Sequence, residues 1–175
     1  MAGSNPENRG WVLERVLELN PRTIVDVGAG AGTYSQLLRP LLPDTIFTAI
    51  EIYPKNISQY NLNSLYDHVL CMDVRDVSTF GKETDLVIFG DVLEHMNRDD
   101  AMFVWNLARR DAKYGIISMP IIHYPQGEID GNIHETHVVD DWNNLKIFES
   151  FRDIKECRLG DVTGAYLAKF RGENA

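Results

Sequence analysis

Short apolar runs alternate with amphipathic segments along most of the chain. Runs of strand length, rich in β-branched and other apolar residues, occur at 23–27, 45–50, 66–72, 85–89 and 114–119. The segments between them show helical spacing, as in Tyr34, Leu37, Leu38 and Leu41 at i, i+3, i+4 and i+7. Strands that alternate with helices predict right-handed crossovers and a parallel core sheet, hence an α/β fold.

The two ends of the chain extend this pattern. A leading helix is predicted over 6–20, with Asn5 as its cap, Pro6 in its first turn and Pro21 beyond its end. After the fifth strand, Asp140 is expected to cap a short helix. Apolar runs at 154–159 and 162–170 then flank a turn at Gly160, which predicts a β-hairpin.

A glycine-rich turn directly follows the first predicted strand. Gly28, Gly30 and Gly32 are spaced two apart, and Asp26 lies in the strand just before them. Glycine allows a sharp turn and close approach of a ligand to the backbone, and the next helix offers free amides. Open α/β sheets bind ligands at this end of their strands. A dinucleotide fingerprint would read G-x-G-x-x-G, but Thr33 holds the position of its third glycine.

An acidic residue, Glu51, ends the second predicted strand. One carboxylate there can accept hydrogen bonds from both hydroxyls of a ribose. Glu51 therefore favours a cofactor that contains adenosine, and it fits S-adenosylmethionine and a nicotinamide dinucleotide equally well. A ligand-free turn followed by a surface carboxylate is the structural alternative.

Three stretches together resemble the class I S-adenosylmethionine-dependent methyltransferases. The glycine turn with Asp26 is similar to their motif I, Glu51 stands where motif II has its acid, and Gly90-Asp-Val-Leu-Glu-His-Met96 is similar to motif IV of the small-molecule enzymes. The resemblance covers nearly the whole chain. It implies a Rossmann-like, doubly wound, seven-stranded, mostly parallel sheet with a reversed C-terminal β-hairpin, formed by one domain over 1–175.

The same resemblance implies S-adenosylmethionine as cofactor and S-adenosylhomocysteine as product. In the family, the residue at Asp73 faces the adenine amino group, the amide of Val74 meets a ring nitrogen, and Asp91 helps to hold the methionine part. A cap for a short helix at 77–80 is the alternative role for this acidic loop, with Asp76 as a second candidate for it. The predicted cofactor-binding residues are Asp26, Gly28, Gly30, Gly32, Glu51, Asp73, Val74 and Asp91.

The long connection at 120–140 is expected to form a lid over the acceptor substrate. Long loops in compact domains are often functional, and this one starts at the carboxyl end of the fifth strand. It carries the candidate catalytic residues His123, His134 and His137. A histidine can act as general base because its pKa lies near neutrality. Histidines that only hold the loop shut are an equally weighted alternative.

No metal site is predicted in this loop. His134-Glu-Thr-His137 reads H-E-x-H, whereas H-E-x-x-H is the spacing that places two histidines on one helical face. Gly127 and Gly131 also disfavour a helix here.

These features predict a methyltransferase that moves a methyl group to a small-molecule or glycan-type acceptor by in-line displacement. Such a transfer depends mainly on proximity and orientation. A protein that binds the cofactor without turnover is one alternative. A nicotinamide-dependent oxidoreductase is another, which the glycine spacing and the 91–95 stretch disfavour.

Composition narrows the partners and the cellular location. The 175-residue chain has a formal net charge of −9, which argues against broad binding to nucleic acid. An apolar signal segment and a run of ~18 apolar residues are both missing, so we expect no membrane partner and a cytoplasmic location. Cys71 and Cys157 are expected to be buried free thiols. The sequence carries no signal for an oligomeric state.

Overall fold

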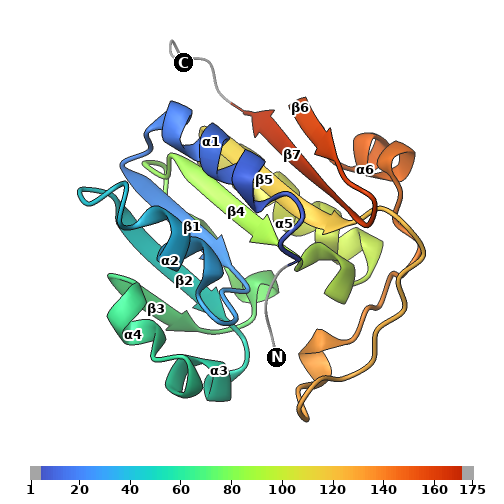
Figure 1. Cartoon of the computed structure of the whole chain (residues 1–175), viewed down its shortest axis with the longest axis horizontal. Helices are drawn as coiled ribbons and strands as arrows, with labels where there is room; N and C mark the ends of the chain where they lie inside the picture. The colour runs from blue at the N-terminus through green and yellow to red at the C-terminus, as the bar shows by residue number, and fades with distance from the viewer. Residues whose placement is uncertain (1–4, 171–175) are drawn as a thin grey trace.

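The computed structural model describes residues 5–170 and contains one seven-stranded sheet with the strand order β3-β2-β1-β4-β5-β7-β6 (Figure 1). The strands are β1 (Thr23–Val27), β2 (Ile46–Glu51), β3 (His68–Cys71), β4 (Leu86–Gly90), β5 (Tyr114–Pro120), β6 (Ile154–Leu159) and β7 (Thr163–Lys169). The α-helices are α1 (Arg9–Leu19), α2 (Thr33–Leu38), α3 (Pro54–Gln59), α4 (Leu62–Leu65), α5 (Arg98–Asp111) and α6 (Asn144–Ser150). Three 3-10 helices are η1 (Val74–Asp76), η2 (Leu93–His95) and η3 (Ile133–Glu135).

The sheet is parallel from β3 to β5 and antiparallel beyond. β1 pairs with both β2 and β4, so that Val27 lies beside Ile50 on one side and Phe89 on the other. β7 runs antiparallel to β5 and to β6. This topology confirms the predicted Rossmann-like sheet with a reversed C-terminal hairpin. It also brings the carboxyl ends of β1, β2 and β4 together at one edge, where the strand order reverses direction.

Helices cover both faces of the sheet (Figure 1). Alternate residues of each central strand therefore enter different cores, which explains why these strands are apolar throughout. One core joins α1 and α2 to inward-facing strand residues such as Ile24 and Leu86. The other joins α5 and α6 to residues such as Val25 and Val87.

Several local predictions are corrected by the structure. α1 begins at Arg9 rather than at Pro6, because the Asn8 side chain is buried and donates a hydrogen bond to the Thr163 carbonyl oxygen at 2.8 Å. α6 is capped by Asn143, whose side chain accepts from the Lys146 amide, and not by Asp140. Residues 77–80 form no helix; the 3-10 helix η1 ends just before them.

The two cysteines are free thiols, as expected, but both are exposed. Cys71 lies in β3 and Cys157 in β6, which are the two edge strands of the sheet. An edge strand has a neighbour on one side only, so its side chains are more open to solvent. The apolar residues next to Cys71 and Cys157 in the sequence therefore did not predict the exposure of the two thiols.

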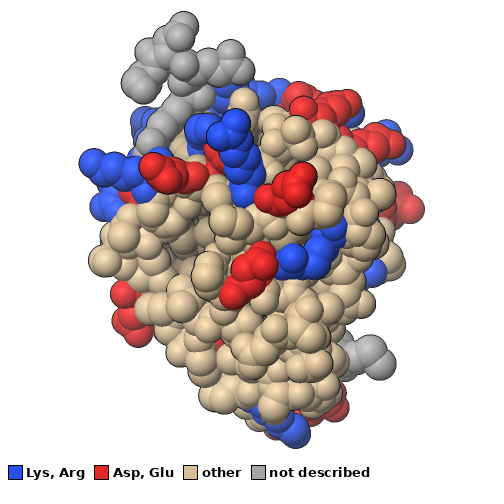
Figure 2. Space-filling view, turned by 90° about the vertical axis from the view of Figure 1, so that its left-hand side faces the viewer, with Lys and Arg blue, Asp and Glu red and all other residues tan. Residues whose placement is uncertain are grey.

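Residues 5–170 contain no helix that is long and apolar enough to cross a membrane. On the face that Figure 2 shows, basic and acidic side chains of the described residues are interspersed and form no continuous basic patch.

Candidate active site

A cavity of about 280 Å³ opens at the carboxyl ends of β1, β2 and β4. The backbone of the glycine turn forms one wall, where the Gly28 amide donates to the Ile50 carbonyl oxygen at 2.8 Å. The loop after β4 and the 120–140 loop form the opposite walls. The cavity thus lies at the switch point of the sheet, where the topology leaves a crevice.

The glycines of the turn are required by geometry as well as by space. Gly28 and Gly32 have left-handed φ angles of 65° and 74°, which residues with a Cβ adopt only at a cost. A Cβ on Gly28 would also lie 2.5 Å from Cγ2 of Val92, and one on Gly32 would lie 2.5 Å from Cδ1 of Leu65. Gly28 and Gly30 line the cavity, whereas Gly32 lies behind it as the N-cap of α2.

Glu51 connects the glycine turn to the end of β2. One of its carboxylate oxygens accepts from the Gly30 amide at 2.8 Å and the other accepts from the Tyr53 amide at 2.8 Å. The residue is only 4% exposed, yet it lines the cavity. A carboxylate has about four lone-pair sites, so each oxygen keeps capacity for a ligand hydroxyl.

Asp26 lies on the floor of the cavity. Its carboxylate accepts a hydrogen bond from the Tyr66 hydroxyl at 2.5 Å. Burial raises the pKa of Asp26 to about 7, against the opposing effect of the Tyr66 hydrogen bond. Tyr66 was absent from the sequence prediction, because it comes from the start of the predicted third strand, far along the chain.

Asp73 and Val74 line the cavity at the start of η1. The Asp73 carboxylate accepts from the Arg75 amide at 2.9 Å and forms an ion pair with the Arg75 guanidinium at 2.5 Å. These hydrogen bonds to Arg75 lower the pKa of Asp73. Asp73 therefore caps η1 from the cavity wall, whereas the helix at 77–80, for which Asp76 was the candidate cap, is absent.

Asp91 follows β4 with a left-handed φ of 54°, which aims its carboxyl group at the cavity. One carboxylate oxygen accepts from the Asn5 amide at 2.6 Å, while the other is buried without a hydrogen-bond partner in residues 5–170. Burial raises the pKa of Asp91 to about 7. The segment before α1 thus closes over this acid, a contact that the sequence did not indicate.

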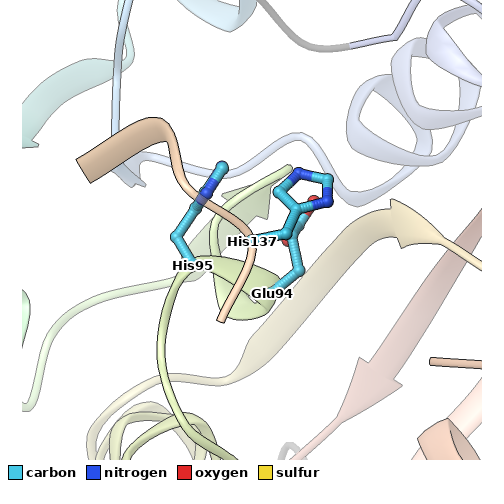
Figure 3. A group of neighbouring side chains, drawn as sticks. All are labelled: Glu94, His95 and His137. Carbon is cyan, nitrogen blue, oxygen red and sulfur yellow. The ribbon is translucent and has the colours of Figure 1, made fainter. Parts of the chain in front are cut away.

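A second acid and two imidazoles lie next to Asp91. Glu94, His95 and His137 converge on the cavity wall, the first two from η2 and the third from the 120–140 loop (Figure 3). Burial raises the pKa of Glu94 well above its ordinary value, and the nearby Asp91 adds to this effect. Burial lowers the pKa of His95 to about 4 and also lowers that of His137, so both imidazoles are neutral at physiological pH.

The 120–140 loop is attached to η2 through the backbone. The amides of Val138 and Val139 both donate to the Glu94 carbonyl oxygen, at 2.9 and 3.1 Å. This attachment brings His137 over the cavity, and His134 lines it as well. His123 is not among the lining residues; its side chain is 70% exposed and its Nδ1 lies 3.7 Å from the Asp140 carboxylate.

The sequence from residue 25 to 118 matches a protein family described as "Methyltransferase domain". This match spans more than half of the chain. The chain belongs to the methyltransferase domain family. The assignment confirms the predicted enzyme class, an S-adenosylmethionine-dependent methyltransferase, and the predicted cofactor.

Solved structures share the fold at low sequence identity. An S-adenosylmethionine-dependent methyltransferase from Clostridium acetobutylicum has a TM-score of 0.69 at 13% identity, over 93% of this chain and 90% of that one. The N-terminal domain of EvdMO1 with S-adenosylhomocysteine bound has a TM-score of 0.69 at 13% identity, over 97% and 82%. An O-methyltransferase family protein from Burkholderia thailandensis has a TM-score of 0.66 at 16% identity, over 94% and 57%. No curated protein matches the sequence significantly.

The chain does not span all of its structural relatives. It covers 57% of the Burkholderia protein and 54% of a similar structure from Nostoc punctiforme. These identities show a common fold and leave the acceptor of the methyl group to be argued from the site itself.

Within the methyltransferase domain, acidic side chains outnumber basic ones in the cavity lining. Arg75 is the one lysine or arginine among the described residues that line it. The acidic residues in the lining are Asp26, Glu51, Asp73, Asp91, Glu94 and Glu135. A lining of this kind favours a cation and disfavours the two phosphates of a dinucleotide.

Two cavity acids, Glu94 and Glu135, lay outside the predicted site. Glu94 lies within the stretch that carries the motif IV resemblance, so a signal for it was present in the sequence. Glu135 lies in the lid, where the search for a base had concentrated on histidines. Burial raises its pKa, and the nearby charge of Glu51 adds to this.

Proposed function

We propose that this methyltransferase transfers the methyl group of S-adenosylmethionine to a small-molecule or glycan-type acceptor that enters beneath the 120–140 loop. The observation that carries the proposal is the acidic cavity at the switch point, beside the glycine turn and Glu51. Its volume of about 280 Å³ lies near the lower end of the ~300–1,000 Å³ common for small-molecule sites. The cofactor occupies part of this space, so the part beneath the 120–140 loop suits a compact acceptor or the end of a longer one.

The cofactor side of the cavity fits the group that the family uses. Glu51 offers lone pairs to the ribose hydroxyls, and the Gly28–Gly30 backbone permits close approach. Asp73 and the Val74 amide, which line the same cavity, would hold the adenine. Asp91, with one unpartnered buried oxygen, suits the cationic amino end of the methionine part. When bound, S-adenosylmethionine supplies an electrophilic methyl group, so the transfer itself needs little further activation.

The remaining task of the chain is to orient the acceptor and to take up a proton where the acceptor loses one. Orientation can contribute on the order of 7–11 kcal/mol to lowering the barrier. Of the three predicted histidines, we propose His137 as the residue closest to this role. Its Nδ1 lies 2.6 Å from the Tyr124 carbonyl oxygen, which leaves the Nε2 lone pair available. A catalytic role for His134 or His123 stays a prediction that single substitutions can test.

The solved EvdMO1 domain adds support for a sugar-like acceptor in this fold. That domain was determined in the presence of S-adenosylhomocysteine and D-fucose. We propose further that residues 1–175 act as one domain with 120–140 as the substrate lid, that neither nucleic acid nor a membrane is a partner, and that the location is cytoplasmic.

Parallel calorimetric titrations with S-adenosylmethionine, S-adenosylhomocysteine and NAD test the cofactor half of the proposal. We expect saturable binding of the first two and none of NAD. Incubation with S-adenosylmethionine and a panel of hydroxylated metabolites and sugars, with detection of S-adenosylhomocysteine, tests the transfer. Binding of NAD alone would point to an oxidoreductase, and cofactor binding without turnover on any acceptor would favour the non-catalytic alternative.

A further inference from the structure

Three potential metal ligands meet on the wall of the cavity. A carboxylate oxygen of Glu94 and ring nitrogens of His95 and His137 all lie within 4.8 Å of one another. Figure 3 shows the three side chains side by side, with His95 and Glu94 carried by η2 and His137 by the lid. The rings of the two histidines are 4.9 Å apart between centroids. The cluster thus joins two segments that are more than forty residues apart in the sequence.

Both imidazoles are oriented by a hydrogen bond on the same nitrogen. Nδ1 of His95 lies 3.2 Å from the Thr136 carbonyl oxygen, and Nδ1 of His137 lies 2.6 Å from that of Tyr124. A carbonyl oxygen can only accept, so each Nδ1 carries the proton and each Nε2 keeps a free lone pair. This is the arrangement found around metal-ligating histidines, whose second nitrogen is held by a backbone carbonyl or a carboxylate.

Glu94 supplies the independent sign that a cation belongs here. The residue is 0% exposed, and neither carboxylate oxygen has a hydrogen-bond partner from another residue in the described part of the chain. The charged form of a buried acid without partners is costly, and a positive ligand offsets that cost. The charged groups that act on Glu94, Asp91 and Glu135, are also acidic, and their negative charge would favour binding of a cation at this place.

We propose that Glu94, His95 and His137 bind one divalent transition-metal ion at the edge of the acceptor pocket. Two imidazoles and one carboxylate suit Zn²⁺ or Fe²⁺ better than Mg²⁺, which prefers oxygen ligands. Three protein ligands leave open positions, as in catalytic sites. Ligand bonds of about 2.0–2.2 Å require the three side chains to move slightly inward, which rotation of the half-buried His137 side chain in the lid would permit.

The sequence analysis expected no metal because it examined the H-E-x-H spacing of 134–137 alone. The cluster uses only the last of those four residues. Its other members come from the 91–95 stretch, so no single-segment spacing could have indicated the site.

The proposal deepens the proposed function and rests on it for its role in the reaction. The open positions of the ion would face the cavity, where an acceptor could bind through an oxygen atom. With the ion in place, His137 is a ligand rather than a base, and the ion itself would favour loss of a proton from the bound oxygen.

Metal binding can be measured on the full chain after removal of metals with a chelator. Calorimetric titration with Zn²⁺ and with Co²⁺, with the Co²⁺ absorption spectrum as a second readout, should give one site per chain. Glu94→Gln and His137→Ala should each weaken binding by at least about tenfold. His68→Ala and Glu128→Gln remove an exposed histidine and an exposed acid that are not members of the cluster, and should leave the affinity unchanged.

The outcomes separate this proposal from the one it rests on. Equal metal affinity in wild type and in both cluster variants, or no stoichiometric binding, would overturn the metal site. S-adenosylhomocysteine is titrated into the same samples, and failure of wild type to bind it would overturn the proposed function instead. If Glu94→Gln fails to fold, His137→Ala still decides, because His137 lies on the half-buried lid and outside both cores.

Discussion

The proposed cofactor side and the proposed acceptor side of the cavity are built differently. On the cofactor side, Asp26 and Glu51 belong to central parallel strands, are almost fully buried, and are held by hydrogen bonds of 2.5–2.8 Å. On the acceptor side, His134 is exposed and His137 is half-buried. These two histidines belong to a long loop attached to η2 through the Glu94 carbonyl oxygen.

The difference indicates which part of the site keeps one conformation when its ligand binds and which part rearranges. A cofactor of fixed shape favours groups that need no rearrangement when it binds, and buried strands provide them. An acceptor must enter and leave, so we expect the groups around it to lie on a loop outside the sheet. The cluster of Glu94, His95 and His137 lies between the two sides, because η2 directly follows the core strand β4 and His137 belongs to the lid.

The largest expected effect comes from the glycine turn. Gly28→Ala places a Cβ 2.5 Å from Val92 at a φ of 65°, so we expect the free energy of unfolding to fall by more than ~1–2 kcal/mol and cofactor binding to be lost. Gly127→Ala is the matched control in the lid, where a Cβ meets nothing within 4 Å. Denaturant unfolding and titration with S-adenosylhomocysteine measure both. Retention of wild-type affinity by Gly28→Ala would show that the turn does not approach the cofactor.

The lid histidines come next, with an effect on turnover rather than on cofactor affinity. His137→Ala should lower kcat by about 10²–10⁴-fold, whether the residue takes a proton or binds an ion. His123→Ala should change kcat little, because its side chain is 70% exposed and lies outside the cavity lining. His134→Ala completes the series. Equal and small losses in all three variants would leave orientation as the whole mechanism.

Glu51→Ala should weaken S-adenosylhomocysteine binding by about 10–100-fold, the value of one or two hydrogen bonds to a charged group. Calorimetry measures the affinity, and circular dichroism checks that the fold is retained. Glu128→Ala, an exposed acid of the lid, is the control. An unchanged affinity in Glu51→Ala would remove its role at the ribose.

The smallest effect concerns pH. The pKa of Asp91 is raised to about 7 by burial, so this acid gains its negative charge as pH rises through that value. A cationic ligand binds the ionised form more tightly, so affinity for S-adenosylmethionine should rise by about tenfold in total between pH 6 and pH 8. S-adenosylhomocysteine carries the same amino group that Asp91 is proposed to hold, so its affinity should rise in parallel. A pH-independent affinity for both ligands would contradict this role of Asp91.

Much of the cofactor half could be predicted from the sequence because its signals are local. The Gly28–Gly32 spacing, the acid at Glu51 and the D-V-L-E-H stretch each lie next to an apolar strand. In a parallel sheet the ends of adjacent strands must meet at one edge. Helix boundaries were less accurate, as at Asn8, where a buried contact with Thr163 overrides the capping preference of Asn5.

The order of strands and helices, the C-terminal hairpin and the long 120–140 connection could be predicted from the periodicity and spacing of residues near one another in the chain. The cofactor class followed from the resemblance of three such local stretches to the methyltransferase family. Only the tertiary structure decided the partners across the cavity: Tyr66 on Asp26, Asn5 on Asp91, and His137 beside Glu94 and His95. Their burial, protonation and available lone pairs depend on which distant segments pack together, because solvent exclusion and hydrogen-bond geometry are properties of the folded chain.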